Sequence, residues 1–135
     1  MNDAEFLKHL EAGDLHEFPH RAHIRMAWLY LRAEDFEQGS LKIRRQIRQI
    51  VERHGAPGKY HETISLFWIA LVQYALSLTP EIDDFEAFVA AHDHLLDTRL
   101  IKAHYSPALL SASRKVWAAP DLRPLPGAAF EQEPT

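Results

Sequence analysis

The 135-residue sequence contains no cysteine. This absence excludes disulfides, thiolate catalysis, iron–sulfur clusters and cysteine-ligated zinc, and it fits a reducing compartment. Glycine is also scarce, with five residues. The sequence has no glycine-rich phosphate loop and no dinucleotide-binding fingerprint. The motifs that most readily identify nucleotide-dependent enzymes are therefore missing.

An excess of positive charge and a long apolar run are missing as well. The net charge of −4 argues against general affinity for nucleic acids, which usually requires a basic face. The longest apolar run, residues 64–78, is interrupted by polar residues and is too short and mixed to span a membrane. Residues 1–8 are acidic and amphipathic, unlike a secretory signal. We therefore expect a cytoplasmic protein that contacts neither membrane nor nucleic acid.

Apolar residues recur at helical spacing along most of the chain, and no strand pattern competes. Asn2 or Asp3 can cap the first helix, and Asp83 with Glu86 forms a capping-box arrangement before the fifth. Gly39 and Ser40 are expected to break or kink the start of the third helix. The predicted helices cover residues 3–12, 19–32, 34–53, 59–78, 83–98 (extending as far as 102) and 106–117.

The connections between these segments are short, which favours antiparallel packing of neighbouring helices. Residues 120–135 carry four prolines and show no helical period. The sequence therefore predicts an all-α fold: a single-domain, antiparallel helical bundle of four to five main helices over residues 1–119. An extended, proline-rich C-terminal arm over residues 120–135 follows it and packs on the bundle where it begins.

Two histidines lie at the start of the second predicted helix. Pro19 suits the first position of a helix, where a missing N–H costs nothing. His20 and His23 then project from one face, one turn apart. The same stripe continues with Ala27 and Leu31, so this face is expected to turn inward. The pair is therefore a candidate for a metal or small-molecule site.

An up-and-down bundle would bring further histidines to the same end. His61 and Glu62 begin the fourth predicted helix, and His92 lies on the apolar stripe of the fifth. Metal sites in bundles are built from side chains on facing helices. We therefore predict that His20, His23 and His61 bind a divalent metal ion, with His92 as a possible additional ligand. Three imidazoles suit zinc or copper, whereas imidazoles with a carboxylate suit iron or manganese.

Two functions follow from these residues. If the protein is an enzyme, metal-bound water would be the reactive species and Glu62 its proton acceptor, in a metal-dependent hydrolase or oxygenase acting on a small-molecule substrate. The alternative is a non-enzymatic protein-interaction module in which the histidines are structural. Its partner would bind either the proline-rich arm or the basic face of the helix around residues 42–53. The acidic balance of the whole chain favours a solvated surface at that basic face.

Several segments together resemble a group of small bacterial helical proteins of unknown function. The likeness spans residues 18–126 and suggests that the two histidine segments belong together, without implying an activity. The segments are Phe18-x-His20-x-x-His23-x-Arg25-x-Ala27-Trp28, Lys59-Tyr60-His61-Glu62-Thr63-Ile64, Tyr105-Ser106 and Pro120-Asp121-Leu122.

Overall fold

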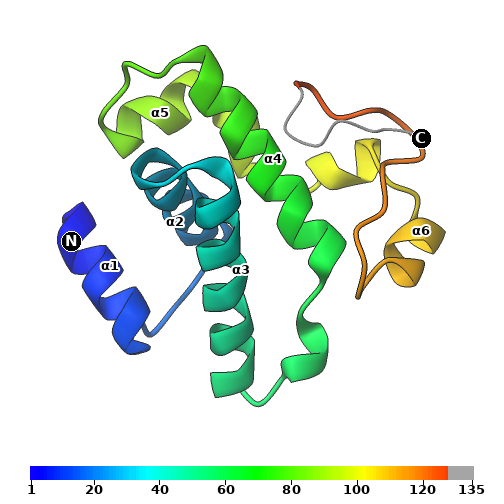
Figure 1. The fold of residues 1–135 in the computed structure, drawn as a ribbon, viewed down its shortest axis with the longest axis horizontal. Coiled ribbons are helices and arrows are strands. Elements are labelled where there is room, and N and C mark those ends of the chain that lie inside the picture. Colours follow the sequence, from blue (N-terminus) through cyan, green and yellow to red (C-terminus); the bar gives the residue numbers. More distant parts are fainter. Residues whose placement is uncertain (128–135) are drawn as a thin grey trace. The chain divides into compact units, whose positions relative to one another are not determined.

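A computed structural model describes residues 1–127 and shows a helical fold with no strand in that range (Figure 1). The all-α prediction is therefore confirmed. None of the helices within residues 1–127 is both long and apolar enough to cross a lipid bilayer. The predicted arm lies partly outside the described residues, since residues 128–135 are not part of them. The α-helices are α1 (Asp3–Ala12), α2 (His20–Ala33), α3 (Phe36–Arg53), α4 (Glu62–Leu78), α5 (Phe85–Ala91) and α6 (Pro107–Ala112), and the 3₁₀ turns are η1 (Pro57–Lys59), η2 (Asp93–Leu96) and η3 (Leu100–Ala103).

The chain divides into two compact units. The first unit, residues 1–60, contains α1, α2, α3 and η1. The described part of the second unit, residues 61–127, contains α4, α5, α6, η2 and η3. The start of the predicted arm, at residue 120, lies within the second unit.

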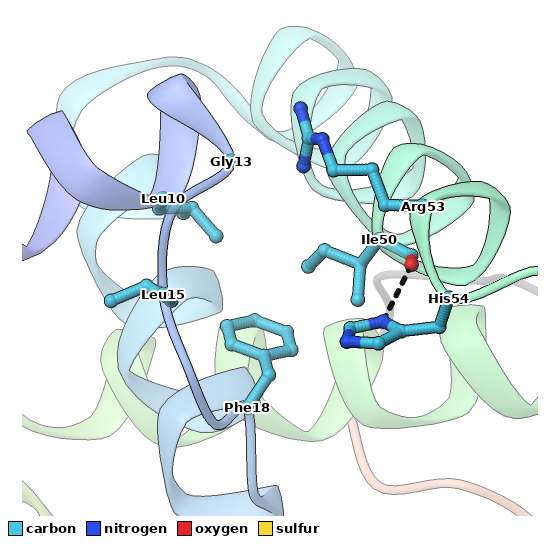
Figure 2. A pocket seen from close by; sticks show the side chains of 7 residues that line it. All are labelled: Leu10, Gly13, Leu15, Phe18, Ile50, Arg53 and His54. Atoms are coloured by element: carbon cyan, nitrogen blue, oxygen red, sulfur yellow. Dashed lines mark hydrogen bonds between the residues drawn. The ribbon is translucent and has the colours of Figure 1, made fainter.

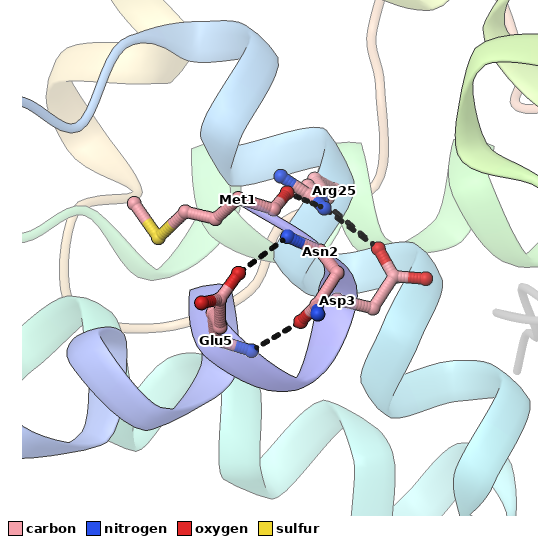
Figure 3. A network of polar contacts seen from close by, with 5 residues as sticks. All are labelled: Met1, Asn2, Asp3, Glu5 and Arg25. Carbon is pink, nitrogen blue, oxygen red and sulfur yellow. Dashed lines mark hydrogen bonds and ion pairs between the residues drawn. The ribbon is translucent and has the colours of Figure 1, made fainter.

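Local hydrogen bonds define both ends of α1, as the sequence predicts. Asn2 and Glu5 form a reciprocal capping box at its start, and Gly13 ends the helix in the left-handed conformation, with φ of 77°. The Arg25 guanidinium on α2 donates to the Asp3 carboxylate at 2.8 Å and to the Met1 carbonyl at 3.0 Å (Figure 3). These contacts attach the start of α1 to α2.

Helices α2 and α3 form an antiparallel pair joined by Glu34 and Asp35. The predicted break at Gly39 and Ser40 is wrong, since α3 is continuous from Phe36 to Arg53. Gly39 serves packing instead. A Cβ atom there would lie 3.1 Å from the Tyr30 carbonyl oxygen, so the absence of a side chain allows the two helices to approach closely. This pairing brings the end of α3 back to the beginning of α2.

In the second unit, α4 and α5 are shorter than predicted. Helix α4 begins at Glu62 rather than Lys59, because residues 57–59 form a 3₁₀ turn and His61 is the N-cap. Helix α5 is capped by Asp84 rather than Asp83, and it ends at Ala91 rather than near residue 98. His92 leaves the helical conformation there, and its Nε2 lies 2.9 Å from the Thr79 hydroxyl oxygen.

The chain after α6 is held along the start of α4 by backbone groups. The Glu62 N–H donates to the Arg114 carbonyl at 2.7 Å. The fully buried Thr63 hydroxyl donates to the Val116 carbonyl and accepts from the Ala118 N–H, each at 3.2 Å. Helix α6 therefore ends at Ala112 rather than near residue 117, and the following residues run alongside α4 in a non-helical conformation.

This arrangement predicts the effect of Thr63→Val. Valine has nearly the same shape but leaves the Val116 carbonyl and the Ala118 N–H without their partner, so we expect the free energy of unfolding to fall by about 1–3 kcal/mol. Limited proteolysis should also cut the variant faster between residues 114 and 120. Thr79→Val, which removes a hydroxyl elsewhere in the same unit, is the control. Unchanged cleavage near residue 116 would show that Thr63 does not hold this segment.

Candidate functional site

The predicted metal ligands are divided between the two units. His20 and His23 lie on α2 in the first unit, whereas His61, Glu62 and His92 lie in the second. Within residues 1–127, neither unit holds a group of three or more histidine, aspartate or glutamate side chains arranged to bind a metal ion. Metal binding by these residues therefore stays a prediction, and their surroundings are described one by one.

His23 lies in a poorly hydrated environment. Its ring packs edge-on against Phe18, with ring centroids 4.2 Å apart. Burial, with a smaller contribution from the charge of His20, lowers the pKa of His23 to about 4. The two side chains are therefore close enough to interact, as their spacing predicts. His23 is neutral at pH 7, packed against an aromatic ring.

Both ring nitrogens of His61 are occupied by backbone groups. Nδ1 accepts a hydrogen bond from the Ile64 N–H at 3.1 Å, which caps α4. Nε2 lies 2.7 Å from the Leu110 carbonyl oxygen and must donate to it, since a carbonyl can only accept. The lone pair that would bind a metal is thus committed to the helix N-terminus. Glu62 follows in the first turn of α4, where a negative charge stabilises the helix.

His92 is also held by its own unit. It is buried at the end of α5, against the Phe88 ring and the Thr79 hydroxyl. Burial lowers the pKa of His92, and His94 contributes in the same direction. A third buried histidine, His104, donates from Nδ1 to the Arg123 carbonyl at 2.9 Å. These contacts make the buried histidines of the second unit hydrogen-bonding groups of the fold.

The first unit contains a pocket of about 390 Å³ between the end of α1 and the end of α3 (Figure 2). Side chains of Leu10, Phe18 and Ile50 point toward one another and form its apolar wall. Its volume lies near the lower end of the range of roughly 300–1,000 Å³ that is typical of small-molecule sites. The full lining comprises Leu10, Gly13, Leu15, Phe18, Ile50, Arg53 and His54.

Arg53 supplies a positive charge at the edge of this pocket. Its exposed side chain extends from the last turn of α3 to Gly13, where a Cβ atom would overlap the guanidinium group. The left-handed backbone favours glycine at this position, and the absence of a side chain leaves room for the Arg53 guanidinium. Among residues 1–127, no hydrogen bond or ion pair engages the Arg53 guanidinium. A cation beside the end of α1 also complements the negative end of that helix.

His54 presents a second polar group next to Arg53. Its Nδ1 donates to the Ile50 carbonyl at 2.9 Å, which orients the ring at the end of α3. Nε2 is the other polar atom of the ring, on the side of the ring that Figure 2 shows toward Phe18. The pocket therefore combines an apolar wall with a guanidinium group and an oriented imidazole on one side.

The sequence contained only weak signals for this pocket. Arg53 belongs to the predicted basic face, but much of that face is already engaged: Lys42 pairs with Glu34 at 2.6 Å, and Arg48 lies over the Tyr60 ring at 4.5 Å. The available signal was a pair of apolar residues, Leu15 and Phe18, in a non-helical connection where solvent-exposed polar residues are the norm.

In comparisons with known proteins, no family model, no curated protein and no solved structure matches this chain.

Proposed function

We propose that the protein is a non-enzymatic binding module. In this proposal the histidines stabilise the fold, and the pocket between the ends of α1 and α3 takes the ligand. The observation that carries it is the pairing, in one cavity, of an apolar wall with an Arg53 guanidinium that no described residue engages. Apolar cavities with a few convergent polar groups are the usual form of ligand sites.

The contacts of His61 support the non-enzymatic part of this proposal. A catalytic metal ligand needs a free nitrogen lone pair, whereas His61 uses Nδ1 to cap α4 and Nε2 to bind the Leu110 carbonyl. Glu62, the predicted proton acceptor, occupies the first turn of the same helix, where its charge has a structural role. Both residues are thus explained by the stability of α4.

The test is a titration of the full-length, ¹⁵N-labelled protein with octan-1-ol and with octanoate, followed by NMR. We expect amide shifts to change in residues 10–18 and 50–54. Ile50→Trp fills the apolar wall and should abolish these changes, whereas Leu41→Trp, an exposed position on the same helix, should leave them intact. Circular dichroism checks that both variants are folded.

Two results would overturn the proposal. If neither compound shifts the amide signals of residues 10–18 or 50–54, the pocket does not bind small apolar molecules. Alternatively, elemental analysis of untagged protein could show about one equivalent of zinc, iron, copper or manganese that is lost in a His20→Ala/His61→Ala double variant. That result would favour the metal site and the enzymatic function.

A further inference from the structure

We propose that the ligand of this pocket is a small carboxylate carried on an apolar chain or ring. This inference rests on the proposed function, because it assigns a ligand class to the same pocket. The apolar part would lie among Leu10, Phe18 and Ile50, and the carboxylate would bind the Arg53 guanidinium at the edge. The inference depends on charge complementarity and on the size of the cavity.

The titratable side chains that line the pocket favour an anion. Arg53 and His54 are its titratable lining residues, and the other five are Leu, Ile, Phe or Gly. The nearby Asp14 carboxylate is 2.7 Å from Nδ1 of His9 and is paired with that residue rather than with Arg53. A guanidinium binds a carboxylate through two parallel hydrogen bonds, which makes carboxylates its best-matched small ligands.

The position of Arg53 defines where the carboxylate would lie. The guanidinium packs on the backbone at Gly13, so its stem follows the edge of the pocket and its donors lie near the end of α1. Nδ1 of His54 donates to the Ile50 carbonyl, so Nε2 of the neutral ring is an acceptor and the carboxylate would bind the Arg53 guanidinium instead. The head group would thus lie at the polar edge, and the apolar part would extend toward Leu10 and Phe18.

A small free molecule fits better than a segment of a protein partner. The cavity of about 390 Å³ is lined by seven residues of a single unit and lies at the lower end of the size range of ligand pockets. Protein interfaces instead bury on the order of 800 Å² of each partner and require a broad contact surface. A peptide that ends in an apolar residue and a free carboxylate is therefore tested as the competing ligand.

The experiment compares octanoate, octan-1-ol and octylammonium on the full-length protein by NMR titration of residues 10–18 and 50–54. We expect octanoate to bind at least tenfold more tightly than the other two. Arg53→Met keeps the length of the side chain and removes the charge, so it should weaken octanoate binding about 10- to 100-fold. Octan-1-ol binding should change less than twofold in this variant. Arg45→Met, an exposed arginine on α3 outside the pocket, is the matched control.

The remaining outcomes separate this inference from the proposed function. If octan-1-ol binds in the pocket as tightly as octanoate and Arg53→Met has no effect, the pocket is a ligand site and the carboxylate assignment is wrong. If a peptide ending in Leu-Leu with a free carboxylate binds more tightly than octanoate, the ligand is a protein terminus. If none of the compounds shifts these residues, the proposed function itself fails.

Discussion

Replacing His61 with alanine should lower the free energy of unfolding by about 2–4 kcal/mol. Two losses contribute to this value. The Ile64 N–H loses the side chain that caps α4, and the Leu110 carbonyl loses its donor in a part-buried position. Since His61 itself is buried, water would not fully replace these contacts. The measurement is urea denaturation at pH 7.

His61→Asn separates the two losses. Asparagine is a good N-cap and can accept from the Ile64 N–H, but it is too short to reach the Leu110 carbonyl as well. We expect its stability to lie between those of wild type and His61→Ala. His94→Ala, which removes an exposed histidine from the same unit, should change stability by less than about 0.5 kcal/mol. A His61→Ala variant as stable as wild type would contradict the structural role, and loss of a bound metal from that variant would identify a ligand.

Elements determined by local residues were predicted well from the sequence. The cap of α1 at Asn2, the end of α1 at Ala12 and the start of α6 after Ser106 depend on groups within four residues of one another. Helical periodicity also identified the apolar character of α4, most of whose residues are buried. These features need no information about distant parts of the chain.

The sequence is least informative where a distant partner decides the outcome. Periodicity gives the face on which His61 lies but not the partners of its nitrogen atoms, and one partner, Leu110, is 49 residues away. Helix α5 ends early at His92, which meets Thr79 on the preceding connection. The candidate pocket depends on the end of α3 returning to Gly13 and Phe18, which only the packing of α2 and α3 reveals.

The protein should lose stability as the pH falls from 6.5 toward 4, because His23 resists protonation in the folded state. Burial lowers its pKa from 6.5 to about 4, with a smaller contribution from His20. Within this window the unfolded chain binds a proton that the folded protein excludes. Each unit of pH decrease in this window therefore lowers the free energy of unfolding by about 1.4 kcal/mol, and the whole interval lowers it by about 3 kcal/mol. Below pH 4 both states are protonated at His23 and its contribution stays lost.

Comparison with His23→Gln isolates this contribution. Other groups also contribute to the pH dependence. The lowered pKa values of Asp97 and Asp121 add stability that is lost at more acidic pH. The pKa of His92 is lowered in the folded state, as that of His23 is. Subtracting the variant's pH profile from that of the wild type cancels these groups. The difference in the free energy of unfolding should decline as the pH falls from 6.5 to 4, and it should be constant above pH 7. The control, His16→Gln, alters an exposed histidine and should leave the profile unchanged.

A second variant tests the physical cause. Because the charge of His20 contributes to the shift, His20→Gln should raise the pKa of His23 as measured by NMR titration of its imidazole, while burial should still hold that pKa below 6.5. The pH profile of stability should then become shallower without disappearing. If His23 instead titrates near 6.5 in the wild type, its ring is hydrated in solution, and the close packing of Phe18 against it is wrong. Phe18 also lines the pocket, so that result would weaken the structural basis of the ligand site as well.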